Sequence, residues 1–163
     1  MGMPDIRIVT MGAQRFAYVH EFGTRSGEME RTASAKLRRW AKAEGLLDAP
    51  RGFHYFGAND PPPVKDGDRY GYFSGMTVPA GTKASGEVKV RDIAPATYAV
   101  LRFKGLYRIG EMWQTLYGWA EKSREWKVAG HGLEEILAPL EGEVVDAEPE
   151  RMVFDLWLPV EKK

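Results

Sequence analysis

Ala-Gln-Arg-Phe-Ala at residues 13–17 is matched by Pro-Ala-Thr-Tyr-Ala at residues 95–99, in the type of residue more than in its identity. Further matches keep a similar offset of about 80 residues, and they are Gly23 with Gly105, Trp40 with Trp119, and Val78-Pro79 with Leu158-Pro159. Two copies of this length are too few for a solenoid or an array. The sequence therefore predicts a duplicated module, with halves at about residues 5–80 and 87–160, inside one domain that spans residues 1–163.

Hydrophobic periodicity predicts the same order of elements, strand–helix–strand–strand, in each half. In the first half we expect a helix over residues 28–44 and strands over residues 6–20, 53–57 and 69–78. In the second half we expect a helix over residues 108–122 and strands over residues 88–103, 133–137 and 152–158. This order predicts an α+β fold, in which two helices pack against an antiparallel or mixed sheet. We expect one pseudo-two-fold domain with a central cleft, because ligands often bind at such junctions.

Composition excludes several classes of function. The chain has 23 basic and 23 acidic residues, so its formal net charge is +0. It lacks the excess of basic residues that attracts the phosphates of nucleic acid. The absence of cysteine excludes disulfides, thiol catalysis and cysteine-ligated zinc. No secretion signal is visible at the first residues, and no apolar run approaches the roughly 20 residues of a membrane span. We therefore expect a cytoplasmic protein without a nucleic-acid or membrane partner.

One carboxylate of the second half stands between apolar neighbours. Glu135 lies in a predicted strand, and alternation places Leu133 and Leu137 on its face of that strand. Burying a carboxylate is costly unless it meets a cation or a hydrogen-bond donor. Glu135 either faces solvent, as its neighbour Glu134 could, or serves a binding or catalytic site.

Aromatic residues make up 12% of the chain, and some of them could line a pocket rather than fill a core. Trp113 and Tyr117 lie one turn apart on the flank of the second predicted helix, and Trp157 lies in the last predicted strand. No metal-ligand spacing connects the three histidines, His20, His54 and His131. The sequence therefore predicts neither a metal site nor a cofactor.

Several stretches resemble the GyrI-like small-molecule-binding domain, which also forms the effector-binding half of multidrug-sensing and AraC-type transcription regulators. In the second half the matching stretches are VRDIAPATYAVL at residues 90–101, residues 105–119 ending in WQTLYGW, EIL at residues 135–137 and DLWLPV at residues 155–160. The first half matches more weakly, through residues 13–19 and 70–79. The resemblance covers nearly the whole chain, although the proline run at residues 61–63 is richer than the family usually has.

The resemblance implies that Glu135 lies at the floor of a small-molecule pocket and attracts cationic or polar ligands. Leu137 would also line that pocket, where the family usually has a tyrosine, so the expected hydroxyl is missing. The candidate aromatic walls are Trp113, Tyr117 and Trp157, followed by Tyr107 and by Tyr55, which the repeat aligns with Glu135.

Three hypotheses of function follow. The first is a stand-alone protein that binds amphipathic, aromatic or cationic small molecules, since the two halves leave no room for a helix-turn-helix domain. The second, implied by the resemblance, is a hydrolase of strained cyclopropane-bearing alkylating compounds with Glu135 as general base, in which Tyr55, Tyr107 or Tyr117 would supply the acid. The third is a protein-interaction module acting on DNA gyrase, for which the acidic residues 146–150 are the sole candidate surface.

Overall fold

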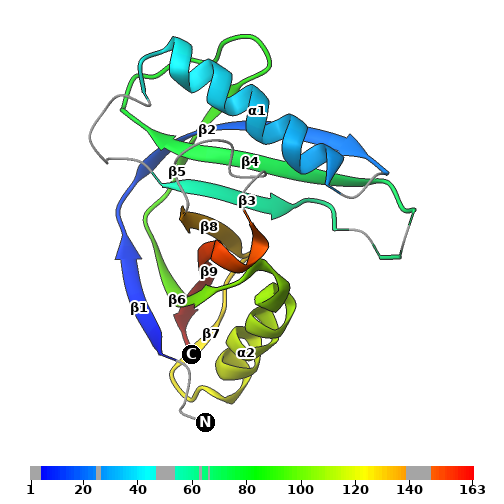
Figure 1. Ribbon diagram of the computed structural model, residues 1–163. Helices are drawn as coiled ribbons and strands as arrows, with labels where there is room; N and C mark the ends of the chain where they lie inside the picture. Colours follow the sequence, from blue (N-terminus) through cyan, green and yellow to red (C-terminus); the bar gives the residue numbers. More distant parts are fainter. Residues whose placement is uncertain (1–4, 25–26, 47–53, 63, 66, 139–147) are drawn as a thin grey trace. The chain divides into compact units, whose positions relative to one another are not determined.

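The computed structural model describes residues 5–24, 27–46, 54–62, 64–65, 67–138 and 148–163 (Figure 1). The chain divides into two compact units. We call Gln14–Ile93 the inner unit, and Met1–Ala13 together with Ala94–Lys163 the terminal unit. Within the described residues, no helix is long and apolar enough to cross a membrane.

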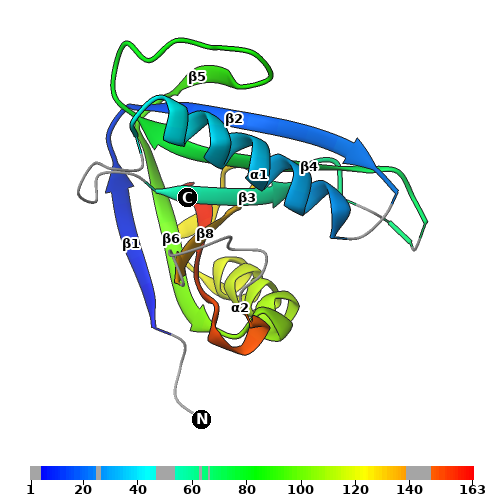
Figure 2. The same cartoon turned by 45° about the horizontal axis from the view of Figure 1, so that its top comes forward.

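The inner unit is an antiparallel sheet with one helix on one face. Its elements are β2 (Gln14–Gly23), α1 (Glu28–Ala43), β3 (Tyr55–Asn59), β4 (Tyr70–Val78) and β5 (Lys89–Ile93). Strand β4 pairs with β3 and β2, and β2 also pairs with β5, so the order across the sheet is β3-β4-β2-β5. Figure 2 shows α1 lying along these strands.

Helix α1 forms because its apolar residues recur at helical spacing. Its buried side chains are Met29, Ala33, Ser34, Leu37, Trp40 and Ala41, and the apolar ones pack with Ala17 and Val19 of β2 and Met76 of β4. Gly27 precedes the helix with φ 86°, a left-handed conformation that glycine adopts without steric cost. Glu28 and Glu30 in the first turn, and Lys42 in the last, suit the helix dipole.

The terminal unit is also an antiparallel sheet with a helix on one face. Its elements are β1 (Ile6–Met11), β6 (Ala96–Lys104), a 3₁₀ turn η1 (Leu106–Arg108), α2 (Ile109–Lys122), β7 (Trp126–Val128), β8 (Leu133–Ala138), a 3₁₀ turn η3 (Pro149–Arg151) and β9 (Val153–Lys162). The strand order is β8-β9-β6-β1, and β7 also pairs with β9. Helix α2 buries Met112, Leu116 and Ala120 against apolar side chains of β6 and β9.

Both predicted helices and the α+β class are confirmed, whereas two predicted strands are each divided in two. The expected strand over residues 88–103 becomes β5 and β6, interrupted before Pro95, and the strand over residues 6–20 becomes β1 and β2. β5, from the second half of the sequence, pairs with β2 of the first half, and β1, from the first half, pairs with β6 of the second half. Each unit therefore has one edge strand from the other half of the sequence. Short β7 and the turn η3 were not predicted. Of the acidic stretch 146–150, the first two residues lie outside the described residues.

Candidate functional site

Three charged side chains form a row across the sheet of the terminal unit. Glu135 of β8 is directly opposite Asp155 of β9, and Asp155 is directly opposite Arg102 of β6. Residues that are directly opposite on paired strands share one face of the sheet. The alternate residues Phe154 and Leu156 belong to the core under α2. The charged row therefore lies on the face away from α2.

Glu135 is a buried carboxylate within an aromatic frame. Its residue is 4% exposed, and the indole Nε1 of Trp157 donates a hydrogen bond to its Oε1 at 2.9 Å. Tyr98 of β6 meets Trp157 edge to face, with ring centroids 5.4 Å apart. Burial raises the pKa of the Tyr98 phenol above its ordinary value. Glu135 therefore shares this face of the sheet with two large aromatic side chains.

Asp155 is held by two arginines. Arg102 donates from Nε to Oδ1 at 2.9 Å and from a terminal nitrogen to Oδ2 at 2.9 Å, while Arg7 of β1 donates to Oδ2 at 3.0 Å. The Asp155 side chain is 3% exposed, whereas the Arg102 side chain is 58% exposed. Forked pairing of a guanidinium with a carboxylate is among the stronger hydrogen-bonded arrangements in proteins. The pair therefore fixes the orientation of Arg102.

The structure does not bring the predicted walls Trp113 and Tyr117 to Glu135. Trp113 of α2 donates its Nε1 hydrogen to Oε1 of Glu134 at 3.0 Å. Tyr117 packs against Trp113, with ring centroids 5.8 Å apart, and is 40% exposed. Successive side chains of a strand point to opposite faces, so Glu134 faces α2 while Glu135 faces away from it. Each glutamate has its own tryptophan, on its own side of the sheet.

The other predicted site residues lie in different elements. Tyr107 lies in η1 and is 75% exposed. Tyr55 is buried in the core of the inner unit under α1. Leu137 is half-buried at an irregularity in the β8–β9 pairing, between Ile136 and Ala138. Of the predicted set, Glu135 and Trp157 share a hydrogen bond, and Trp113 and Tyr117 are in ring contact.

Sequence reasoning missed three residues of this face: Tyr98, Arg102 and Asp155. Tyr98 and Asp155 lie inside stretches that carried the family resemblance. The alternation of side chains along each predicted strand could therefore have shown which residues share a face with them. Their place on the same face of the sheet as Glu135 depends on the register of β6, β8 and β9, which no local pattern reveals.

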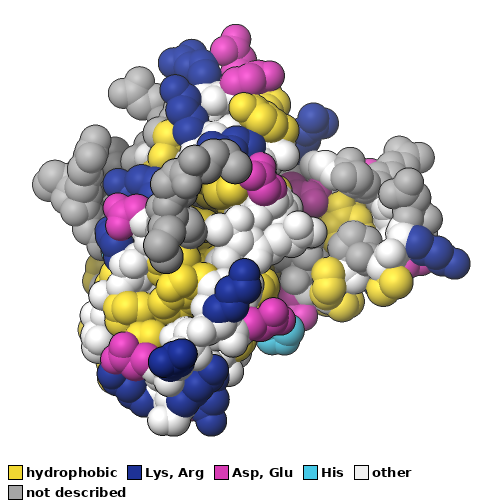
Figure 3. Space-filling model, turned by 90° about the horizontal axis from the view of Figure 1, so that it is seen from below, with side chains coloured by type: hydrophobic (Ala, Val, Ile, Leu, Met, Phe, Trp, Pro, Cys, Tyr) yellow, Lys and Arg dark blue, Asp and Glu magenta, His cyan; other side chains and the backbone are white. Residues whose placement is uncertain are grey.

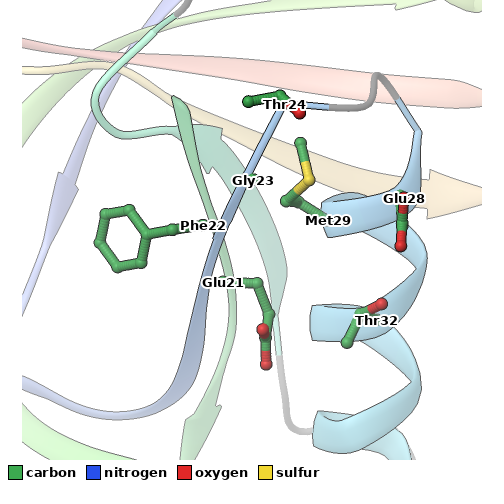
Figure 4. Close-up of a pocket in the computed structure, with 7 residues that line it drawn as sticks. All are labelled: Glu21, Phe22, Gly23, Thr24, Glu28, Met29 and Thr32. Carbon is green, nitrogen blue, oxygen red and sulfur yellow. The ribbon is translucent and has the colours of Figure 1, made fainter. Parts of the chain in front are cut away.

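A separate hollow of about 360 Å³ lies in the inner unit, between the end of β2 and the first turns of α1. Its lining residues are Glu21, Phe22, Gly23, Thr24, Glu28, Met29 and Thr32. In Figure 4 the Phe22 ring points to the side of β2 away from α1, while Met29 and Thr32 project from the helix. Lys36 forms an ion pair with Glu21 at 2.6 Å. None of the predicted site residues lines this hollow.

Exposed hydrophobic side chains gather on part of the face shown in Figure 3, with basic and acidic side chains around them. Large exposed hydrophobic residues in the described chain include Ile8, Phe22, Leu106, Tyr107, Tyr117 and Val128. Such residues are common on soluble proteins and identify no ligand by themselves. Within the described ranges, no cluster of three or more His, Asp or Glu side chains could hold a metal ion.

Comparison with protein families gives one clear match. The family model described as "GyrI-like small molecule binding domain" matches residues 4–161. Comparison with curated proteins gave no match.

Solved structures share the fold at low sequence identity. The crystal structure of the EcmrR C-terminal domain aligns with a TM-score of 0.67 and 14% identity, covering 99% of this chain and 100% of that chain. SAV2435 bound to tetraphenylphosphonium aligns with a TM-score of 0.54 and 14% identity, covering 96% and 94%. A hydrolase encoded by lin2189 from Listeria innocua aligns with a TM-score of 0.65 and 14% identity, covering 96% and 91%. At these identities the likeness shows the fold.

Proposed function

Because the chain belongs to the GyrI-like small-molecule-binding domain family, we propose that it binds amphipathic, aromatic cations, with Glu135 and Trp157 at the centre of recognition. The observation that carries this proposal is the burial of Glu135, which is 4% exposed and hydrogen-bonded to the indole of Trp157. Glutamate is almost never buried this deeply unless its carboxylate has partners, and the Trp157 indole is one of the partners of Glu135.

The chemistry of this face suits such a ligand. A carboxylate in a low-dielectric setting attracts a cation more strongly than one in water does. Trp157 and Tyr98 are large aromatic rings on this face, and a cation over an aromatic ring gains about 0.5–2 kcal/mol. Since Glu135 and Trp157 are nearly fully buried, a ligand needs space to open beside them, which slows association below ordinary rates.

Replacing Glu135 by glutamine tests the proposal, because the change keeps the shape and removes the charge. We expect Glu135→Gln to weaken binding of tetraphenylphosphonium at least about tenfold, which is about 1.4 kcal/mol. Binding of triphenylphosphine oxide, a neutral aromatic probe, should change less than about threefold. Isothermal titration calorimetry measures both affinities, and quenching of tryptophan fluorescence supports them.

The matched controls lie on the opposite face of the same sheet. Glu134→Gln and Trp113→Phe alter the pair that faces α2, and both should leave cation affinity within about threefold of the unchanged protein. Trp157→Phe should weaken binding, because it removes ring area and the donor to Glu135. Equal effects of Glu134→Gln and Glu135→Gln, or no cation binding at all, would overturn the proposal.

Hydrolysis of a strained electrophile is a second candidate, supported by the buried carboxylate and by structural neighbours named as hydrolases. Glu135 would take a proton from water while the water oxygen bonds to a cyclopropane carbon. The strained carbon–carbon bond breaks, and its electron pair accepts a proton from solvent. Tyr98 is a phenol on the same face of the terminal sheet as Glu135, and it is a further candidate for the acid beside the tyrosines suggested by the sequence.

The same Glu135→Gln variant separates catalysis from binding. Loss of a general base lowers a rate by about 100- to 10,000-fold. If the protein is a hydrolase, the variant should bind a cyclopropane-bearing alkylating compound without opening its ring, as followed by mass spectrometry. Ring opening at the same rate in the variant would exclude Glu135 from the reaction.

We also propose that the two halves arose from one duplicated strand–helix–strand–strand module. The strand orders β3-β4-β2-β5 and β8-β9-β6-β1 support it, as does a helix after the first inner strand of each unit. Superposition of residues 6–79 on residues 88–159 should place Trp40 near Trp119. If the two halves do not share the same order and direction of elements, the repeat in the sequence is accidental.

A further inference from the structure

Strand β1 forms an open edge of the terminal sheet. It pairs with β6 along one side, over the six residues Ile6–Met11, and no other described strand pairs with it. In Figures 1 and 2, β1 has β6 on one side and no labelled strand on the other. Alternate residues of an edge strand direct their backbone N–H and C=O groups away from the sheet, where another strand can bind them.

β1 lacks the features that usually protect such an edge. Its sequence, IRIVTM, contains no lysine, proline or acidic residue, and its register with β6 has no bulge. Its one charged side chain, Arg7, reaches across β6 to donate a hydrogen bond to Asp155 of β9 at 3.0 Å. That charge is therefore directed away from the open edge. Ile8 is 41% exposed, although its side chain is large and apolar.

The other edge strands carry the protection that β1 lacks. β5 pairs with β2 alone among the described strands, and three of its five residues are exposed and charged: Lys89, Arg91 and Asp92. The short strand β7 pairs with β9 alone and has Lys127 in the middle of its three residues. Charged side chains along an edge disfavour pairing with a further strand. An added strand therefore fits β1 better than it fits β5 or β7.

We propose that β1 is a dimerisation edge, to which the β1 strand of a second copy of this chain binds in antiparallel orientation. A two-fold axis at Ile8 places this residue opposite its own copy. Ile6 then lies opposite Thr10, and Arg7 lies opposite Val9. No like charges face each other in this register, and the pairs on the α2 side of the sheet are β-branched residues, which pack well in sheets.

Two further observations favour a second copy as the partner. The ladder is self-complementary, so one strand supplies both sides of it. The formal net charge of +0 leaves little repulsion between copies. Five paired residues bury less than the roughly 1,200–2,000 Å² of a stable interface, so we expect a weak dimer that dissociates at about 10–100 µM.

Sedimentation equilibrium on the full chain tests the dimer over about 1 to 500 µM, a range around the expected dissociation constant. The weight-average mass should rise from the 18.3 kDa of one chain toward twice that mass. Ile8→Lys should weaken dimerisation at least about tenfold, because two lysine side chains would then face each other at the axis. Its circular dichroism spectrum should match that of the unchanged protein. A chain that stays monomeric over the whole range would overturn the proposal.

Val128→Lys is the matched control. Val128 lies in β7 and is 41% exposed, as Ile8 is. This variant should leave the dissociation constant within about threefold of the unchanged value. If both variants weaken the dimer equally, the cause is the added charge rather than the β1 edge, and the proposal is wrong. A dimer that Ile8→Lys leaves intact forms at another surface, which contradicts the proposal as well.

A mixture of two variants tests the register. Ile8→Glu alone should dimerise as weakly as Ile8→Lys, because two carboxylates would meet at the axis. An equal mixture of the two variants should dimerise at least about tenfold more tightly than either alone, since glutamate of one copy then faces lysine of the other. A mixture no tighter than its components would show that Ile8 does not face its own copy.

Amide hydrogen exchange tests the unchanged protein, and it decides the question if the Ile8 variants do not fold. Dimerisation should slow exchange of the outward-directed amides of β1 at least about threefold at about 500 µM relative to about 1 µM. Amides of β5 provide the internal control and should exchange equally at both concentrations. Equal exchange of the β1 amides at the two concentrations would overturn the proposal.

Discussion

Replacing Leu116 by alanine is expected to lower the free energy of unfolding by about 2–5 kcal/mol. Leu116 of α2 has 0% exposure and packs in the core of the terminal unit together with Leu156 and Leu158 of β9. The change removes buried apolar surface and leaves a cavity that rigid strand backbones fill poorly. Urea unfolding followed by circular dichroism measures the loss.

The matched change in the inner unit is Leu37→Ala. Leu37 of α1 is also 0% exposed and packs against the other sheet. If the chain is one cooperative domain, as the sequence predicts, both variants should shift a single unfolding transition by similar amounts. Two transitions, each sensitive to one variant, would show that the units unfold independently. A loss below about 1 kcal/mol for Leu116→Ala would contradict the packing described for α2.

Replacing Gly71 by alanine should lower stability by at least about 3 kcal/mol, because the added methyl group has no space. Gly71 lies near the start of β4, and its backbone is hydrogen-bonded to Asp60 and Pro61. A Cβ there would overlap the carbonyl oxygen of Asp60 and lie 2.7 Å from Nε2 of His20. The obstructing carbonyl is backbone, and His20 already donates to it at 2.5 Å, so neither group can move freely.

Gly118→Ala provides the control for that experiment. Gly118 lies inside α2, and a Cβ built on it meets nothing within 4 Å. Alanine in a helix interior is more favourable than glycine by about 0.5–1 kcal/mol, so this variant should be slightly stabilised. The same urea measurement serves both variants. If Gly71→Ala is as stable as the unchanged protein, residues 60–61 do not pack against the start of β4 as described.

Much of the fold could be predicted from the sequence because helices depend on near neighbours. The buried stripe from Met29 to Ala41 has helical spacing, and α1 therefore begins and ends within one residue of the prediction. Strand β8 was predicted for the same kind of reason, since Leu133 and Glu135 alternate with Glu134 and Ile136. The partners of the edge strands β1 and β5 could not be predicted, because no local pattern in the sequence identifies the strand with which each of them pairs.

By itself the sequence determined the α+β class, both helices, and Glu135 as a candidate site residue in its strand. Only the tertiary structure decided which side chains accompany Glu135. Trp157 and Asp155 reach its face through the register of β8 and β9, and the sheet separates Trp113 from it. Side-chain direction along a strand follows from the sequence, but which strand lies opposite, and at which residue, depends on hydrogen bonds between distant parts of the chain.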